Sequence, residues 1–446
     1  MKWLVVSVVA VFICLCPVVS VNADGPEPSR FMDPLERERL SYADYAARLG
    51  VETLNTLRMR ELHYLSPPKT LRSPGQDNPL VLIIVNEQLL PSISNALDIY
   101  MLDLAGDGYQ VAVSQVSGHS PVLLRQEIIS WWGDDLDGVV LIGDCPVAWF
   151  ELDDYWGGEH EEFPIELYFM DLDGIWTDSD GDGLFDGHTG SVAPDIWVGR
   201  LDAYHFMDGA ETAFLQNYFA KNHAYRTGTL TLPDRGLAYV DDDWAAWGDW
   251  SLSSAYADTV VINSNNQTTA AHYRSELQNG YEFVHLCAHS CPWVHVFLQN
   301  AGTAGCFFNF DLDMMEPHAF FYNLFSCSNA RFVEWDCLGN KYLFKDSYGL
   351  AIVGSSKTGG MLDTEAFYPG LGAGETLGEA FLDWYQYEAV GGFSLYEKSW
   401  FYGMAVLGDP TLKMHQHGGS CSDRLRDRRD TAGDPDTVMT DQQALT

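Results

Sequence analysis

Short apolar runs alternate with amphipathic segments along the chain from residue 79 onward. The apolar runs have the length of strands that are buried on both faces of a parallel sheet. The amphipathic segments repeat their apolar positions with the period of a helix that covers such a sheet. In the first series the predicted strands are 80–85, 109–113, 138–142 and 196–199, and the predicted helices are 92–105 and 121–132. The sequence therefore predicts an α/β fold with a mostly parallel sheet.

A second series of the same kind follows a Gly- and Asp-rich stretch at 151–190. Its predicted strands are 236–240, 260–263, 282–288, 320–325 and 350–354, and its predicted helices are 210–225, 267–278, 337–346, 375–388 and 396–402. Two series of this size are too large for one small domain and suit either one large α/β unit or two packed subdomains that share one sheet system. We expect two adjacent subdomains, at 79–208 and 209–414.

The start of the chain has the pattern of a secretory signal peptide. Lys2 precedes an apolar run from Trp3 to Val19, and the small residue Ala23 closes the segment. Residues 1–23 are therefore predicted to be removed on export, which places the mature protein outside the cell or in a periplasm. No later run reaches the roughly 18 apolar residues of a membrane span.

Two further segments flank the predicted sheet. Residues 24–78 are rich in Pro, Arg and Glu, with one predicted helix at 42–63, and form an N-terminal arm or pro-segment. Basic residues at 37–39 or 69–72 offer places for an activation cut. The tail at 415–446 has few apolar residues, so we expect it to be disordered.

The net charge of the chain disfavours some classes of binding partner. The chain has 63 acidic and 25 basic residues, a formal charge of -38, which disfavours nucleic acid and anionic membranes as partners. The oligomeric state is not indicated.

Two of the nine cysteines lie in the signal peptide, and the seven that remain are an odd number. At least one cysteine of the exported protein therefore lies outside any intramolecular disulfide.

A thiol and an imidazole follow neighbouring strands of the second series. His289 and Ser290 come directly after the strand at 282–288, and Cys327 follows the strand at 320–325. Since parallel strands end at one edge of a sheet, we expect the two side chains to meet as an activated cysteine nucleophile and its base. The alternatives are that His289 is an ordinary loop residue and Cys327 half of a disulfide. Cys291, on the loop of His289, is a weaker candidate for the nucleophile.

Six segments in order along residues 79–414 resemble the gingipain family of cysteine peptidases, which are relatives of the caspases. They are VVLIGDCP (139–146), PDIWVGR (194–200), FVHLCAHS (283–290), NLFSCSNARF (323–332), LAIVGSSKTG (350–359) and MAVLGDPTL (404–412). The resemblance implies a caspase/gingipain-like fold and a secreted cysteine endopeptidase. It also implies that His289 is the base, Cys327 the nucleophile, and the amides near Ser290 and Cys327 the oxyanion donors.

The chain departs from the family pattern at two positions beside this pair. Ser290 stands where the family usually has Gly after the histidine, and Ser326 stands where it has Ala before the cysteine. Both residues are small and keep a backbone N–H, so activity is expected to survive. Two alternatives stay open: an inactive caspase-like module that binds a partner at the cell surface, and a processing or transpeptidase enzyme of narrow specificity.

An acidic run at the end of the strand 236–240 offers a partner for the imidazole. The family places an acidic residue after the corresponding strand, and counting register from Leu237 favours Asp243. A carboxylate there would hold the ring tautomer and stabilise the imidazolium. The alternative is a solvated or metal-binding acidic loop.

The segment DSDGDGLFD, residues 178–186, has the spacing of a calcium loop. Alternate carboxylates converge on a hard cation where the chain curls, and Gly183 permits the turn. Thr189 occupies position twelve, where an EF-hand has Glu, so we expect a structural Ca²⁺ site outside an EF-hand. The predicted ligands are Asp178, Asp180, Asp182 and Asp186, with Asp171 and Asp173 as possible helpers. The alternative is an acidic turn without metal.

Overall fold

The computed structural model of the 446-residue chain describes the arm and both strand series. The described residues are 33–66, 78–207, 210–300, 302–360 and 362–414. The predicted signal peptide at 1–23 and the predicted disordered tail at 415–446 lie outside them, as do the basic residues at 69–72. None of the described helices is long and apolar enough to cross a membrane.

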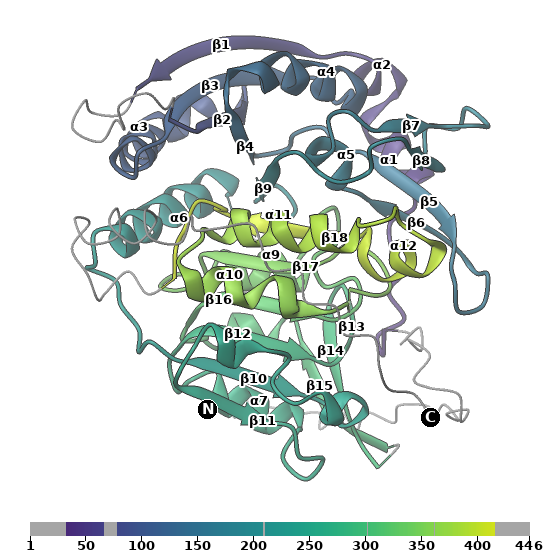
Figure 1. The fold of residues 1–446 in the computed structure, drawn as a ribbon, viewed down its shortest axis with the longest axis vertical. Coiled ribbons are helices and arrows are strands. Elements are labelled where there is room, and N and C mark those ends of the chain that lie inside the picture. Colours follow the sequence, from purple (N-terminus) through teal and green to yellow (C-terminus); the bar gives the residue numbers. More distant parts are fainter. Residues whose placement is uncertain (1–32, 67–77, 208–209, 301, 361, 415–446) are drawn as a thin grey trace, which may run out of the picture. The chain divides into compact units, whose positions relative to one another are not determined.

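Both strand series lie in one sheet of 11 strands, in the order β1-β3-β2-β4-β9-β18-β17-β16-β12-β10-β11 (Figure 1). Its strands are β1 (Arg58–Leu65), β2 (Leu80–Asn86), β3 (Gln110–Ser117), β4 (Leu136–Ile142), β9 (Trp197–Leu201), β10 (Gly236–Val240), β11 (Thr259–Ile262), β12 (Tyr281–Cys287), β16 (Ala319–Phe325), β17 (Ala351–Ser355) and β18 (Met404–Gly408). Only the β1–β3 and β17–β18 pairs in this sheet are antiparallel. The prediction of an α/β fold with a mostly parallel sheet is confirmed. The two series meet where β18 pairs with β9.

Each face of the sheet carries its own apolar core. In β2, Leu80, Leu82 and Ile84 pack in one core, and Val81 and Ile83 pack in the other, because successive side chains point to opposite faces. Helices on the first face are α4 (Pro121–Trp131), α5 (Leu167–Met170), α10 (Tyr368–Ala373), α11 (Leu377–Glu388) and α12 (Leu395–Phe401). Helices on the second face are α1 (Tyr42–Leu49), α3 (Leu90–Gly106), α6 (Glu211–Arg226), α7 (Ala270–Glu276), α8 (Asp311–Met314) and α9 (Leu338–Leu343). Burial of the sheet on both faces explains the nearly continuous apolar runs of its central strands.

Three small antiparallel sheets fill stretches in which the sequence predicted no strands. They are β5 (Trp149–Asp153) with β6 (His160–Pro164), β7 (Ile175–Thr177) with β8 (Gly187–Thr189), and β13 (His289–Cys291) with β14 (Val294–Gln299) and β15 (Gly302–Phe308). The first and the third of these sheets carry residues of the candidate site.

The helix predicted at 42–63 is wrong in its second half. α1 ends at Leu49 and is capped by Gly50, whose φ of +81° is readily adopted only by Gly, and a short α2 (Val51–Leu54) follows. The chain then extends as β1, which pairs with β3 and forms an edge of the sheet. Every side chain of β1 is at least partly exposed, so its sequence lacks the apolar alternation that would have predicted a strand.

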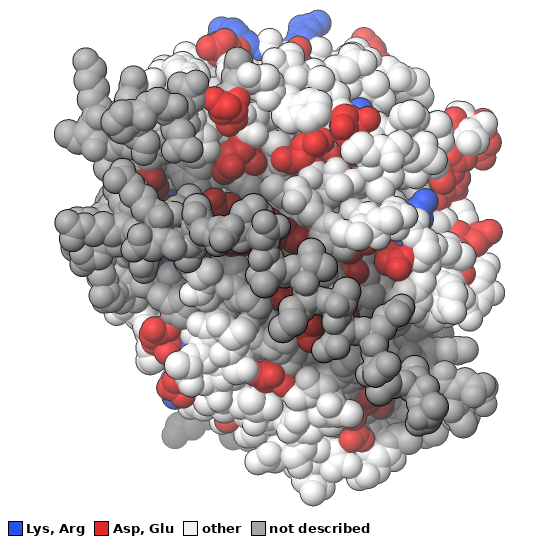
Figure 2. Space-filling view, in the orientation of Figure 1, with Lys and Arg blue, Asp and Glu red and all other residues white. Residues whose placement is uncertain are grey.

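Acidic side chains are spread over the described surface. Figure 2 shows many Asp and Glu side chains and few Lys or Arg side chains on one face of the molecule. This distribution agrees with the formal charge of -38, and it presents a negative potential to incoming partners.

Candidate active site

His289 and Cys327 occupy matching positions beyond two neighbouring strands. β12 and β16 are parallel, with Cys287 opposite Phe325 in the register, so His289 and Cys327 each stand two residues beyond this pair. Parallel strands end at the same edge of a sheet. The structure therefore brings the imidazole-bearing loop and the thiol-bearing loop to one edge.

Asp243 contacts the imidazole from the other side of β12. β10 pairs with β12, with Val240 opposite Cys287, and Asp243 lies in the 3-10 helix Asp242–Trp247 that follows β10. Nε2 of His289 lies 2.8 Å from Oδ2 of Asp243, and the Asp243 side chain is 30% exposed. Among the three consecutive aspartates it is Asp243 that lies against the imidazole.

The side chains of the two other aspartates of this run accept hydrogen bonds from backbone amides instead. Oδ2 of Asp241 accepts the amide of Leu298 at 2.8 Å, and Oδ2 of Asp242 accepts the amide of Asn300 at 2.8 Å. Burial raises the pKa of Asp241 to about 8, although the Leu298 amide opposes this shift. Both side chains tie the 241–247 segment to the end of β14, which helps to fix the position of Asp243.

Cys327 is a free and nearly buried thiol. Its Sγ accepts a hydrogen bond from the amide of Gly359 at 3.4 Å. Burial raises the pKa of the Cys327 thiol, whereas the Gly359 amide and the charge of Lys357 lower it. No disulfide joins the cysteines within the described residues, which are Cys145, Cys287, Cys291, Cys306, Cys327 and Cys337.

The two serines that depart from the family pattern have internal partners for their hydroxyls. Oγ of Ser290 donates within the β13–β14 hairpin, where its acceptors are the carbonyl oxygens of Cys291 at 3.0 Å and Val294 at 3.1 Å. Oγ of Ser326 accepts from Nδ2 of Asn329 at 2.8 Å. Neither substitution leaves an unsatisfied hydroxyl beside the thiol.

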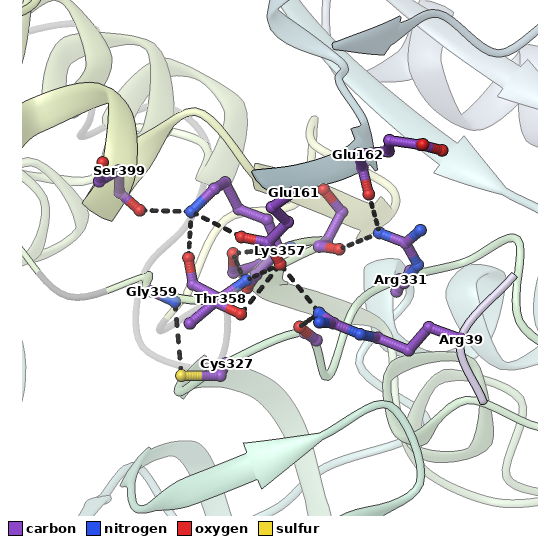
Figure 3. A network of polar contacts seen from close by, with 12 residues as sticks. Arg39, Glu161, Glu162, Cys327, Arg331, Lys357, Thr358, Gly359 and Ser399 are labelled. Atoms are coloured by element: carbon purple, nitrogen blue, oxygen red, sulfur yellow. Dashed lines mark hydrogen bonds and ion pairs between the residues drawn. The ribbon is translucent and has the colours of Figure 1, made fainter. Parts of the chain in front are cut away.

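Three charged residues near Cys327 were not anticipated from the sequence (Figure 3). Lys357 is fully buried, and its Nζ lies 3.4 Å from Oε2 of Glu161. Nη1 of Arg39 donates to Oε1 of Glu161 at 2.8 Å and to Oγ of Ser328 at 3.3 Å. The only sequence signal was the lysine two residues after the buried strand β17, because Glu161 and Arg39 lie in segments without a recognisable pattern.

The arm lies against the loops that carry the candidate pair. The Arg37 guanidinium stacks over the Trp293 ring at 4.6 Å from its centroid, three residues beyond Ser290. The carbonyl oxygen of Leu40 accepts from Arg331 at 2.8 Å. With the arm in this position His289 is 2% exposed and Cys327 is 6% exposed.

The predicted calcium loop gathers carboxylates, with one addition from another element. Oxygens of Asp180, Asp182 and Glu151 lie within 4.8 Å of one another, and Glu151 comes from β5. Asp178 instead accepts the amides of Gly181 and Gly183, at 2.7 and 3.0 Å, and Asp186 accepts the amide of Ser179 at 3.1 Å. Hard oxygen donors of this kind fit Ca²⁺.

The possible helper residues form a separate acidic group. Asp171 and Asp173 gather with Asp195. Oδ2 of Asp171 lies 2.5 Å from Nε2 of His188, and its Oδ1 accepts the amide of Gly174 at 2.7 Å. Asp171 is therefore already engaged with protein groups, and the two helpers belong to a cluster other than that of Asp180 and Asp182.

The site combines a nearly buried thiol with an imidazole–carboxylate pair at one edge of a mostly parallel sheet. These are the catalytic groups that a cysteine-dependent hydrolase uses. The profile of peptidase family C25 matches residues 76–415, so the chain belongs to this family, the gingipain family of cysteine peptidases. It is a hydrolase whose substrates are proteins or peptides. Comparison with curated proteins gave no match, and comparison with solved structures gave none either.

Proposed function

We propose that the protein is an exported cysteine endopeptidase in which Cys327 is the nucleophile, His289 the general base and Asp243 the residue that orients the imidazole. The observation that carries the proposal is the matched register of His289 and Cys327 together with the 2.8 Å contact between His289 and Asp243. His289 takes the thiol proton, and the sulfur attacks the scissile carbonyl carbon. The amides of Ser290 and Cys327 stabilise the oxyanion, and His289 returns the proton to the leaving amine. Water then hydrolyses the thioester.

The electrostatics of the pair support proton transfer within the enzyme–substrate complex. Burial raises the pKa of the Cys327 thiol, which favours the protonated form in the resting enzyme. The Asp243 carboxylate stabilises the imidazolium that appears when the proton moves. Removal of this carboxylate therefore weakens the ionised pair more than the neutral pair.

The test is hydrolysis of denatured casein and of a mixed peptide library by the chain from residue 24 onward. Cys327→Ala and His289→Ala are each expected to abolish cleavage, and Cys291→Ala is expected to retain it. Loss of activity in Cys291→Ala with retention in Cys327→Ala would move the nucleophile to Cys291. Cleavage of a few peptides without digestion of casein would favour the narrow processing enzyme, and no cleavage by the parent would favour the inactive binding module.

The proposal assigns the arm at 24–78 to a pro-segment. Arg37 and Arg39 contact the loops of both candidate residues, so the role proposed for the arm is to cover the site until it is cut. A cut after Arg39 would detach Arg37 and Arg39 from α1, which begins at Tyr42. Peptidase activity is expected to rise when the preparation is cut at 37–39, and a cut preparation with unchanged activity would remove the arm from the proposal.

Calcium and export complete the proposal. The residues Glu151, Asp180 and Asp182 would hold Ca²⁺, which neutralises clustered carboxylates and so stabilises the loop that bears them. The leader at 1–23 directs the chain out of the cytoplasm, and outside the cell Ca²⁺ is abundant enough for a weak structural site. Detection of the mature N-terminus after Ala23 in the exported fraction tests the location.

A further inference from the structure

Lys357 is a buried lysine near the nucleophile that the mechanism above does not use. It lies two residues beyond β17 and is 0% exposed. Its Nζ lies 5.5 Å from the ring centroid of Trp156 and 5.4 Å from that of Phe163. Burial of an ammonium is unfavourable because it loses its hydration, whereas an apolar side chain of similar length would pack there without that penalty. The charge at this position therefore needs an explanation other than packing.

The ammonium of Lys357 fixes the peptide group that faces the thiol. Nζ donates to the carbonyl oxygen of Thr358, and the amide of Gly359, in the same peptide unit, donates to Sγ of Cys327 at 3.4 Å (Figure 3). The C=O and N–H of a trans peptide point in opposite directions, so fixing the carbonyl fixes the direction of the amide. An ammonium bound to the carbonyl also polarises the peptide and strengthens its amide as a donor.

Glu161 holds the peptide on the other side of Thr358. Its Oε1 accepts from the amide and from Oγ1 of Thr358, both at 2.9 Å, and its Oε2 faces Lys357. Burial opposes ionisation, but Lys357 and Arg39 hold the pKa of Glu161 below its usual range. The carboxylate is therefore ionised at neutral pH, and Thr358 is clamped at both its amide and its carbonyl.

A second contact of Lys357 lies directly beside Gly359. Nζ donates to the carbonyl oxygen of Ser399 at 2.5 Å. Gly359 has a φ of +98°, and a Cβ on it would come within 2.6 Å of this same oxygen. The carbonyl oxygen of Lys357 accepts the amide of Ser328 at 2.8 Å. The loop of the lysine and the loop of Cys327 are therefore joined into one unit.

The charges around the thiol come from several segments. Burial raises the pKa of Cys327, the charges of Lys357 and Arg39 lower it, and the charge of Glu161 raises it. Burial lowers the pKa of Lys357, and its ion pair with Glu161 opposes this shift. The titratable and charged groups that interact with Cys327 or Lys357 are Arg39, Asp154, Glu161 and Cys287. His289 follows the strand next to that of Cys327.

We propose that Lys357 is a positioning residue for the peptidase reaction, which holds the Gly359 amide on the sulfur of Cys327 and stabilises the thiolate with its charge. This inference rests on the proposed role of Cys327 as nucleophile. The lysine does not touch the substrate; it acts through one peptide group and through the electric field at the sulfur. The reactivity of the thiol, rather than substrate affinity, is the property that it controls.

The test is the rate of iodoacetamide alkylation at Cys327, followed by peptide mass mapping from pH 5 to pH 10 on the full mature chain. Lys357→Met is expected to move the midpoint of the profile to higher pH, and a midpoint that is higher by one pH unit lowers the rate at pH 7 by about tenfold. Lys357→Arg is expected to restore most of the rate because it keeps the charge. The kcat of peptide hydrolysis at pH 7 is expected to fall in parallel, with little change in KM. An alkylation profile of Lys357→Met that superimposes on that of the parent overturns the proposal.

Glu161→Gln gives a second test, in which the alkylation rate should change in the opposite direction. It also covers the case in which Lys357→Met does not fold. Loss of the anion is expected to raise the alkylation rate at pH 7, and a fall in this rate overturns the proposal. The matched control is Lys221→Met, because Nζ of this buried lysine donates to three backbone carbonyls, at 2.7, 2.5 and 2.5 Å, in the segment 343–348. Lys221→Met is expected to lower the melting temperature without moving the pH profile of alkylation at Cys327. A shift of the midpoint equal to that in Lys357→Met would show that both variants act only through lost stability, which overturns the proposal. Alkylation needs no peptidase activity, so an inactive parent with the predicted profiles would contradict the proposed function alone.

Discussion

Replacement of Asp243 by Asn isolates the contribution of the imidazole partner. The carboxylate contacts Nε2 of His289 at 2.8 Å, and Asn keeps its size while removing its charge. A hydrogen bond to a charged group contributes about 1.5–3 kcal/mol. Because Asp243 is 30% exposed, solvent screens part of this interaction, and the lower end of about 1.5–2 kcal/mol applies. That free energy corresponds to a loss of about 10-fold to 30-fold in kcat/KM.

The assay is steady-state hydrolysis of one cleaved peptide from the library, with Asp242→Asn as the control. Asp242 is the adjacent carboxylate, and it accepts a backbone amide rather than contacting His289. The control is expected to stay within about twofold of the parent, since its acceptor oxygen is kept in Asn. The loss in Asp243→Asn is expected in kcat, with KM nearly unchanged. A kcat/KM within about twofold of the parent would refute the assignment of Asp243.

Three further predictions concern stability. Burial raises the pKa of Asp241 from 3.8 to about 8, so the folded chain keeps a proton that the unfolded chain loses in this range, and stability falls as the pH rises from about 4 to about 8. Asp241→Asn is therefore expected to gain stability over the parent, by up to about 1.4 kcal/mol per pH unit; a melting-temperature difference that is constant with pH contradicts this. Chelation of Ca²⁺ is expected to lower the melting temperature of the parent but not that of the double variant Asp180→Asn, Asp182→Asn, and an unchanged parent counts against the site. Gly359→Ala is expected to cost about 1–3 kcal/mol in urea unfolding, because of its φ of +98° and the 2.6 Å approach to Ser399; an unchanged midpoint would show that this backbone relaxes freely.

The candidate pair was predictable because strand ends are visible in a sequence. Buried strands read as apolar runs, and the residues that terminate two such runs must lie at one edge if the strands are parallel neighbours. His289 and Cys327 follow β12 and β16, whose pairing the structure shows. Asp243 needed one more step, because the pairing of β10 with β12 is not visible in the sequence. The resemblance to the gingipain family implied an acidic residue after this strand, and register counting only chose among the three aspartates.

The residues that surround the thiol were not predictable in the same way. Arg39, Glu161 and Lys357 lie far apart in the sequence, and only the folded chain brings them together. Glu161 belongs to the hairpin of β5 and β6, which lay inside the Gly- and Asp-rich stretch that gave no strand signal. A buried ion pair has no local sequence signature, because its members are selected by tertiary contacts.

The N-terminal arm shows how exposure hides a strand. The segment 58–65 is charged and exposed, so its pattern does not separate an edge strand from a surface helix. Glu151 was not among the predicted calcium ligands for a related reason: an oxygen of its carboxylate lies within 4.8 Å of oxygens of Asp180 and Asp182, but the residue belongs to β5 and not to the recognisable loop. The strand β3, which pairs with β1, and the strand β5, which carries Glu151, both lie elsewhere in the chain than the segment to be predicted.

The most direct test of the central claim is labelling of the mature protein with a panel of peptidyl acyloxymethyl ketones, followed by mass mapping of the modified residue. These reagents need a thiol activated by a neighbouring base. The account predicts that Cys327 is labelled and that His289→Ala abolishes the labelling. Labelling at Cys291, or no labelling under reducing conditions, would contradict it.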